Sequence, residues 1–243
     1  MRTLRTLVLL LLLLALGVPP SWAAVTVDAT STGTFDGTDS HVVSSCSDRL
    51  LTVLAWTSNG NNISAVTSNL DGALTLAGTV QTWQFAAIDH AIAIFYKVAP
   101  SVGTHVLTET HNGSANYMGA TSFCGVHQST PIGTPNGNDD DGLGTTPATV
   151  DVASAGGELV IDAVYGKTGD LMTAGAGQTQ QWQSSPSGSH RFAQSTEAGA
   201  GTVTMSWTLP GSNETWGIVA MSLKPSAAAG GVTPRRALMG VGQ

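Results

Sequence analysis

The chain has 243 residues, of which 10% are charged and 42% are hydrophobic, and its formal net charge is −7. Two of its nine basic residues, Arg2 and Arg5, lie at the very start of the chain. Because nucleic-acid affinity rests on clustered cations that neutralise phosphates, this composition excludes nucleic acid as a partner.

The first 23 residues have the pattern of a secretory signal peptide. The two arginines lead into the unbroken apolar run from Leu7 to Leu16, and the small-residue segment Ser21-Trp22-Ala23 follows. We therefore predict cleavage before Ala24 and a secreted, extracellular protein. No later segment approaches the roughly 20 apolar residues that a transmembrane helix needs, so no membrane span is expected.

After the signal peptide, short β-branched and apolar runs recur between clusters of Gly, Asn, Ser, Asp and Pro, and no stretch keeps a helical period. The clearest predicted strands are Arg49–Trp56, His90–Val98, Thr104–Thr110, Glu158–Tyr165, Thr202–Leu209 and Thr215–Leu223. Weaker candidates are Val25–Ala29, His41–Ser44, Ile63–Ser68, Ala73–Ala77, Tyr117–Cys124 and Ala148–Val152. The mature chain is predicted to be all-β.

The strand patterns favour a sandwich. Residues 202–209 alternate polar and apolar side chains, which is typical of a strand with one face on a core and one in solvent. Residues 50–56 and 216–221 are apolar on both faces and should be central strands. A dozen strands cannot stay one open sheet, so we predict a two-sheet antiparallel β-sandwich, jelly-roll-like, over residues 24–225.

Two segments are expected to lie outside the sandwich. Asn136 to Thr146 is rich in Gly, Asn and Asp and is predicted to be a loop, and residues 226–243 are predicted to be a flexible C-terminal tail.

The two cysteines, Cys46 and Cys124, allow one intramolecular pairing. An exported protein meets an oxidising environment that permits a disulfide, which would stabilise the fold by about 4 kcal/mol in the chain-entropy model. Two separate buried thiols are the alternative.

Five segments of the mature chain resemble a family of secreted β-sandwich proteins that is associated with bacteria and phages and is uncharacterised. They are Ser47–Val53, Phe123–Pro131, Gly157–Asp162, Ala174–Gln180 and Trp216–Leu223. The resemblance implies a jelly-roll, lectin-like sandwich and brings no catalytic residues with it. Cys124 departs from the family pattern, in which a small residue such as Ser is expected, and this favours a disulfide particular to this chain.

The predicted loop contains three successive acidic residues, Asp139, Asp140 and Asp141. Calcium prefers several converging oxygen ligands, so this segment is a candidate Ca²⁺ site. It is not an EF-hand, because Ala148 stands where the final bidentate Glu is required. A solvated acidic turn without metal is the alternative interpretation.

A second candidate metal site lies on the strand that follows Gly103. His105, Glu109 and His111 share one face of that strand, but His105 and His111 are about 20 Å apart and cannot share an ion. Only Glu109 and His111 are left, and a third ligand would have to come from another strand. Exposed polar strand residues are the alternative.

The chain contains no motif for nucleophilic catalysis, since it has neither a Gly-x-Ser-x-Gly elbow nor a His-Glu-x-x-His segment. A glycosidase needs two carboxylates across a cleft, and Asp162 is the carboxylate that its strand context predicts to be half-buried. A hydrogen-bonded structural role for Asp162 is the alternative. We expect a protein that is not an enzyme and that needs no cofactor.

Tryptophan faces stack on sugar rings and are candidates for glycan binding. Trp56, Trp207 and Trp216 lie within apolar strands and are predicted to be core residues. Trp83 and Trp182 are flanked by Gln and Thr, so they are the candidate ligand-binding residues. Hydrophobic plugs under loops are the alternative for both.

These observations favour a secreted, non-enzymatic binding or surface module whose ligand is a carbohydrate or a cell-envelope glycan. The inference that the ligand is a glycan rests mainly on fold analogy. A structural subunit of an extracellular fibre, matrix or particle, forming homo-oligomers, is the second hypothesis. A glycan hydrolase is the third.

Overall fold

The computed structural model describes residues 24–35, 37–140, 146–210 and 215–227. The predicted signal peptide, Asp141 and most of the predicted C-terminal tail lie outside these ranges. Residues Ala24–Ser226 form one compact unit. Its regular structure is made of strands throughout the described ranges, which confirms the predicted all-β class. A search of these ranges for a helix of sufficient length and hydrophobicity to cross a membrane found none.

The first half of the unit, which runs from β1 to β10, contains two antiparallel sheets. The larger has the spatial order β1 (Thr26–Thr32), β10 (Ala115–Cys124), β3 (Leu50–Ser58), β8 (Ile88–Val98) and β6 (Thr75–Leu76), with β7 (Gln81–Phe85) also paired to β8. The smaller has the order β2 (Asp39–Val43), β9 (Gly103–His111), β4 (Ile63–Ser68) and β5 (Gly72–Ala73).

The second half contains two more antiparallel sheets. The larger has the order β11 (Asn136–Asp139), β18 (Trp216–Leu223), β13 (Leu159–Gly166), β16 (Arg191–Ala198) and β15 (Thr179–Ser184). The smaller has the order β12 (Ala148–Ala153), β17 (Thr202–Thr208) and β14 (Thr173–Ala174).

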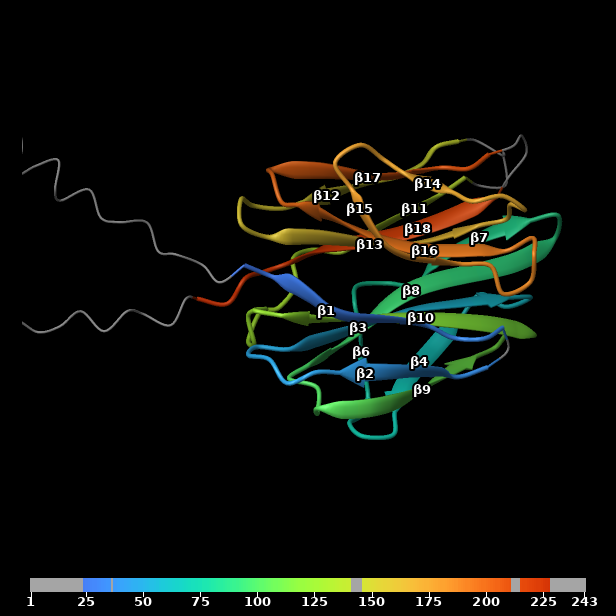
Figure 1. Cartoon of the computed structure of the whole chain (residues 1–243). Helices are drawn as coiled ribbons and strands as arrows, with labels where there is room; N and C mark the ends of the chain where they lie inside the picture. The colour runs from blue at the N-terminus through green and yellow to red at the C-terminus, as the bar shows by residue number, and fades with distance from the viewer. Residues whose placement is uncertain (1–23, 36, 141–145, 211–214, 228–243) are drawn as a thin grey trace, which may run out of the picture. The chain divides into compact units, whose positions relative to one another are not determined.

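The four sheets are stacked in layers (Figure 1), with the two larger sheets in the middle and one smaller sheet outside each of them. Three cores fill the spaces between layers: one inside each half and one between the two larger sheets. Each central strand contributes side chains to two cores. On β3, Leu54 and Trp56 enter the middle core while Val53 and Ala55 enter the core of the first half. The prediction that such strands are covered on both faces is confirmed.

The predicted antiparallel β-sandwich is confirmed, and it contains four sheets where two were expected. The described residues form four sheets, because both β3 and its counterpart β13 are apolar on both faces and each needs a cover on each side. The predicted loop at 136–146 is also corrected, since its first four residues form edge strand β11. Ser226, assigned to the tail, is buried and donates its N–H to the carbonyl of Gly125.

The two halves share one strand order. In each larger sheet, the first strand of the half pairs with the last, and the third strand follows: β1-β10-β3-β8 matches β11-β18-β13-β16. The smaller sheets match in the same way, since β2-β9-β4 corresponds to β12-β17-β14. Most connections pass from one sheet of a half to the other, the exceptions being β4 to β5, β6 to β8 and β15 to β16. The strand order is the predicted jelly-roll-like one, present twice. The unit is therefore a structural duplication.

Each half packs one tryptophan against a glycine of the other half in the middle core. Trp83 on β7 of the first half packs over Gly217 on β18 of the second half. Trp182 on β15 of the second half packs over Gly119 on β10 of the first half. Glycine is required at both positions, because a methyl group there would lie closer than 3.0 Å to indole carbons.

The predicted disulfide between Cys46 and Cys124 is present. It joins the segment between β2 and β3 to the last residue of β10, across 78 positions of sequence. Because most of the first half lies between these two positions, the bridge restricts the unfolded state of that half.

We predict that Gly217→Ala and Gly119→Ala each lower the free energy of unfolding by about 1–3 kcal/mol, the usual cost of overpacking a core. Chemical denaturation measures the effect. Gly156→Ala is the matched control, because a methyl group there meets nothing within 4 Å. Equal stability of all three variants would contradict this packing of tryptophan on glycine as a constraint.

Candidate functional site

The two candidate glycan-binding tryptophans are buried. Trp83 and Trp182 are only 6% and 7% exposed, and each indole covers a glycine of the opposite half. Trp83 donates its N–H to Thr215 Oγ1 at 3.1 Å, and Trp182 donates to Thr121 Oγ1 at 3.2 Å and to a Gln194 oxygen at 3.1 Å. The assignment of these residues to ligand binding is therefore corrected, since neither has a ring face open to a sugar.

The acidic segment is divided between different partners. Asp139, at the end of β11, accepts a hydrogen bond from the side-chain amide of Gln81. Asp140 is 3% exposed and accepts from the Thr215 hydroxyl at 3.0 Å. Asp141 lies outside the described residues. Asp139 therefore joins the two halves, and Asp140 bonds to Thr215, which in turn accepts from Trp83 of the first half. In the described ranges the two carboxylates belong to no cluster of three metal-ligating side chains.

The face that carries His105, Glu109 and His111 points into the first half, not to solvent. His105 is fully buried and accepts from or donates to the Ser68 hydroxyl at 2.7 Å, and its Nε2 lies 2.8 Å from the Ser101 carbonyl oxygen. The expectation of exposed polar residues is thus wrong for His105 and Glu109. The pair Glu109 and His111 gains no third metal ligand within the described chain.

A second buried histidine lies directly across the sheet from the first. His41 on β2 is opposite His105 on β9, and both are 0% exposed. Ser31 donates to Asp39 at 2.8 Å and lies 2.9 Å from His41 Nδ1, so Nδ1 is the protonated ring nitrogen. Burial lowers the pKa of His41 to about 4, and the neighbouring His105 lowers it further in the same direction. The imidazole is neutral at neutral pH.

The carboxyl group of Glu109, in the same core, has few hydrogen bonds. It is 8% exposed, its Oε1 has no hydrogen-bond partner among the described residues, and Asn116 donates to Oε2 only at 3.5 Å. Burial raises the pKa of Glu109 to about 9, and the hydrogen bonds from Asn116 and the Trp56 backbone oppose this only in part. Glu109 is therefore protonated at neutral pH.

Asp162 has the opposite environment. Its carboxyl group is fully buried in the second half and accepts hydrogen bonds from the Ser195 backbone at 2.6 Å, the Ser195 hydroxyl at 2.8 Å and the Trp207 indole at 2.7 Å. Gln178 donates to it at 3.3 Å and accepts from the Ser206 backbone at 2.7 Å. Burial raises the pKa of Asp162 to about 7, and these donors limit the rise. The network links the two sheets of the second half, which is a structural role.

An aromatic stack closes one end of the middle core. The ring centroids of Trp56 and Tyr165 are 4.9 Å apart, and His90 stacks against Trp83 at 5.3 Å and Tyr165 at 5.5 Å. Neither ring nitrogen of His90 has a hydrogen-bond partner within the described chain. Burial lowers the pKa of His90 to about 4, and the nearby His190 and Lys167 act in the same direction, so a neutral imidazole fills this stack.

Two pockets on the described surface are small and have no aromatic side chain among their lining residues. One of about 120 Å³ lies between β11, β18 and the first half. Another of about 240 Å³ is lined by Asn136, Asn138, Thr149, Asp151 and two further residues of β11 and β12. Sites for small molecules usually measure about 300–1,000 Å³, so neither pocket has the size of a typical ligand site.

The most unusual exposed feature is the outer face of the four-stranded sheet. Four of the five exposed large hydrophobic side chains of the described residues lie on it or in the turns at its end: Val42, Leu70, Val102 and Val106. Val42 and Val106 are diagonal neighbours on β2 and β9, because Val106 pairs with Ser40. Leu70 lies against Gly103, which follows Val102. We call these four residues the apolar patch.

The outward strand positions of this face are uncharged. Among the described residues, the positions on β2, β9 and β4 are Ser40, Val42, Ser64, Ala65, Thr67, Thr104, Val106, Thr108 and Thr110. The turns beside Leu70 and Val102 also carry Asp71, which accepts hydrogen bonds from Ser101. The corresponding outer face of the second half is polar: its β17 positions Thr202, Thr204 and Thr208 are exposed, and Thr204 bonds to Asp151 on β12. The duplicated halves therefore differ at this surface.

No family model, curated protein or solved structure matches this chain in the comparisons made with each.

We predict that Asp162→Asn lowers the free energy of unfolding by about 1–3 kcal/mol, because an amide NH₂ would face the donors that now reach the carboxylate. Urea denaturation at neutral pH measures this. Asp151→Asn is the control, since Asp151 is exposed and its loss should change stability by less than about 0.5 kcal/mol. An Asp162 variant as stable as the control would contradict the network.

We predict that Glu109→Gln changes the pH dependence of stability. The pKa of Glu109 is raised in the folded state from 4.5 to about 9. The contribution of Glu109 to the free energy of unfolding is therefore full below pH 4.5 and is lost as the pH rises towards 9. Within this window the wild type should lose up to about 1.4 kcal/mol per pH unit relative to the variant, which stays neutral. Parallel stability curves for the two proteins would show that Glu109 is not protonated.

Proposed function

We propose that this protein is a secreted, non-enzymatic structural module that associates with a second copy of itself through the apolar patch and the outer face around it. The observation that carries the proposal is the concentration of exposed apolar side chains on one uncharged sheet face. Clustered apolar surface of this kind marks interaction sites on proteins, whereas single exposed side chains need no explanation.

A second copy fits this face for electrostatic reasons. The chain has a net charge of −7, so most pairs of surfaces on two copies repel each other. A two-fold contact brings one patch against itself, and the outward strand positions around it carry no charged side chain, which limits like-charge repulsion. The fold already stacks four sheets face to face, and a contact through the apolar patch would add a layer of the same kind.

Other functions have less support in the structure. The buried carboxyl groups Glu109 and Asp162 lie in separate cores, so they do not form the paired carboxylates of a glycosidase. Glycan binding is inferred from a resemblance and from two tryptophans, and both of these tryptophans are buried in the middle core. Export and an extracellular location belong to the proposal and rest on the sequence of the first 23 residues.

We predict that the chain from Ala24 onward is a dimer in solution and that Val42→Glu/Val106→Glu weakens the dimer at least tenfold, because each contact would then bury like charges. Sedimentation velocity over a range of concentrations measures the dissociation constant. The control is Thr202→Glu/Thr208→Glu, which adds the same charges to the outer face of the second half.

The control variant should dimerise like the wild type. A wild-type protein that stays monomeric at the highest concentration would overturn the proposal, and so would equal weakening of both variants. In the first case a glycan array is the next assay, since it would test the remaining binding hypothesis.

A further inference from the structure

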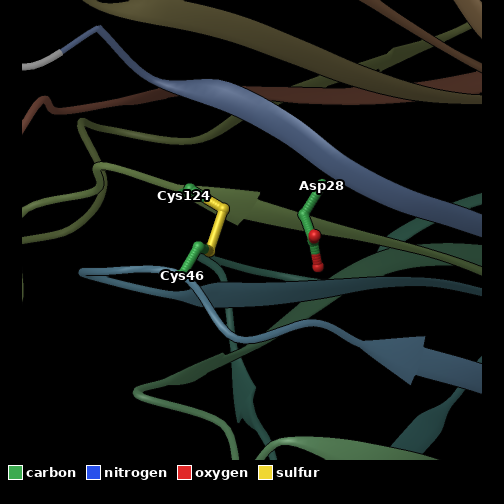
Figure 2. Close-up of side chains that lie close together, drawn as sticks. All are labelled: Asp28, Cys46 and Cys124. Atoms are coloured by element: carbon green, nitrogen blue, oxygen red, sulfur yellow. A yellow bond between two sulfur atoms is a disulfide. The ribbon is translucent and has the colours of Figure 1, made fainter.

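Asp28 lies beside the disulfide of the first half. Figure 2 shows its carboxylate next to the bridge between Cys46 and Cys124. One carboxylate oxygen and the two sulfur atoms all lie within 4.8 Å of one another, and all three residues are half-buried. Among the described residues, this is the one group of three His, Cys, Asp or Glu side chains that close together.

A backbone irregularity directs Asp28 to this place. The register between β1 and β10 shifts between Val27 and Ala29, so Asp28 is the extra residue of a β-bulge. Bulges re-aim side chains and are frequent beside functional sites. The pairs that flank Asp28 are Val27 with Phe123 and Ala29 with Ser122, and Thr26 pairs with Cys124, so the bulge lies next to the end of β10.

The carboxylate is held in one orientation by two hydrogen bonds. The Ser44 backbone N–H donates to Asp28 Oδ2 at 2.9 Å, and the Ser122 hydroxyl donates to the same atom at 2.8 Å. The carboxylate is therefore fixed beside the sulfur atoms.

From this geometry we infer that the Asp28, Cys46 and Cys124 group is a redox-dependent zinc site. In the oxidised protein the disulfide closes the first half, and in the reduced protein Zn²⁺ replaces that link. Cys thiolates and Asp carboxylates are both Zn²⁺ ligands, and a water would complete the tetrahedron. Thiolates also select zinc over the harder Mg²⁺ and Ca²⁺.

The chemistry balances with a dithiol reductant. The reductant gives two electrons and two protons to the bridge, so the S–S bond breaks, two Cys thiols form, and the reductant becomes a disulfide. Zn²⁺ then displaces the two thiol protons as it binds. In the metal-bound state, Zn²⁺ balances the negative charges of the two thiolates and the Asp28 carboxylate, which would otherwise repel one another.

The backbone already has a suitable spacing for this exchange. The two cysteine Cα atoms are 5.9 Å apart. With Zn–S bonds of about 2.3 Å, two thiolates on one tetrahedral ion are roughly 3.7 Å apart, a separation that side-chain rotation supplies. The ion would join the segment before β3 to the end of β10, as the disulfide does.

The test uses the chain from Ala24 onward, reduced without oxygen and titrated with Zn²⁺ against a chromophoric chelator. We expect one tightly bound Zn²⁺ per reduced chain and no comparable binding to the oxidised chain, which has the same fold. Replacement by Co²⁺ should give a thiolate-to-metal charge-transfer band, which reports sulfur ligands directly.

Asp28→Asn should weaken Zn²⁺ binding to the reduced chain at least tenfold while the oxidised variant stays folded by circular dichroism. Asp48→Asn is the matched control, because Asp48 is two positions from Cys46 and outside the group, and its backbone φ of 55° suits Asn. The control should bind Zn²⁺ like the wild type.

Two results would overturn the inference: reduced wild type that binds Zn²⁺ no more tightly than the oxidised protein, or an Asp28 variant with unchanged affinity. If reduction alone unfolds the first half, recovery of the circular dichroism spectrum on adding Zn²⁺ supports the site. In that case, no recovery together with no charge-transfer band counts against it.

Discussion

The structure depends on the contact between its two larger sheets, and the two tryptophans packed across it fix that contact. Trp83 covers Gly217, and Trp182 covers Gly119, so each half supplies the large side chain that the other half accommodates. The indole N–H groups are buried and find acceptors across the same core, including Thr215 and Thr121. Because a buried donor without an acceptor is costly, packing and hydrogen bonding together favour one arrangement of the halves.

Duplication gives the protein two similar halves, and its surface chemistry comes from where they differ. The inner layers are alike, since each central strand feeds two apolar cores. The outer layers are not alike: one smaller sheet presents Val42 and Val106 to solvent, and the other presents threonines. The disulfide and Asp28 also belong to the first half alone. Both proposals therefore concern that half.

Strands with a clear pattern were predictable from sequence, and polar strands were not. β17 alternates and β3 is apolar on both faces, and both lie where this predicts. The sequence does not predict β7, β15 and β16, because polar side chains interrupt the apolar pattern of each strand. In β16 such side chains are buried in hydrogen-bond networks: Gln194 bonds to Trp182, and Ser195 bonds to Asp162. The repeated segments Gln81-Thr82-Trp83-Gln84 and Gln180-Gln181-Trp182-Gln183 were the signal that could have revealed both the duplication and these strands.

By itself the sequence determined the all-β class, the doubly covered central strands and one cysteine pairing, because these follow from local periodicity and from having two cysteines. It also indicated that Asp162 is half-buried or has a structural role, but it did not identify the hydrogen-bond partners of this residue. Only the tertiary structure decided that there are four layers, that Trp83 and Trp182 face inward, that Asp28 meets the disulfide and that Val42 and Val106 face solvent. Each of these depends on which distant strand covers which face, and a strand's own residues do not encode the identity of its cover.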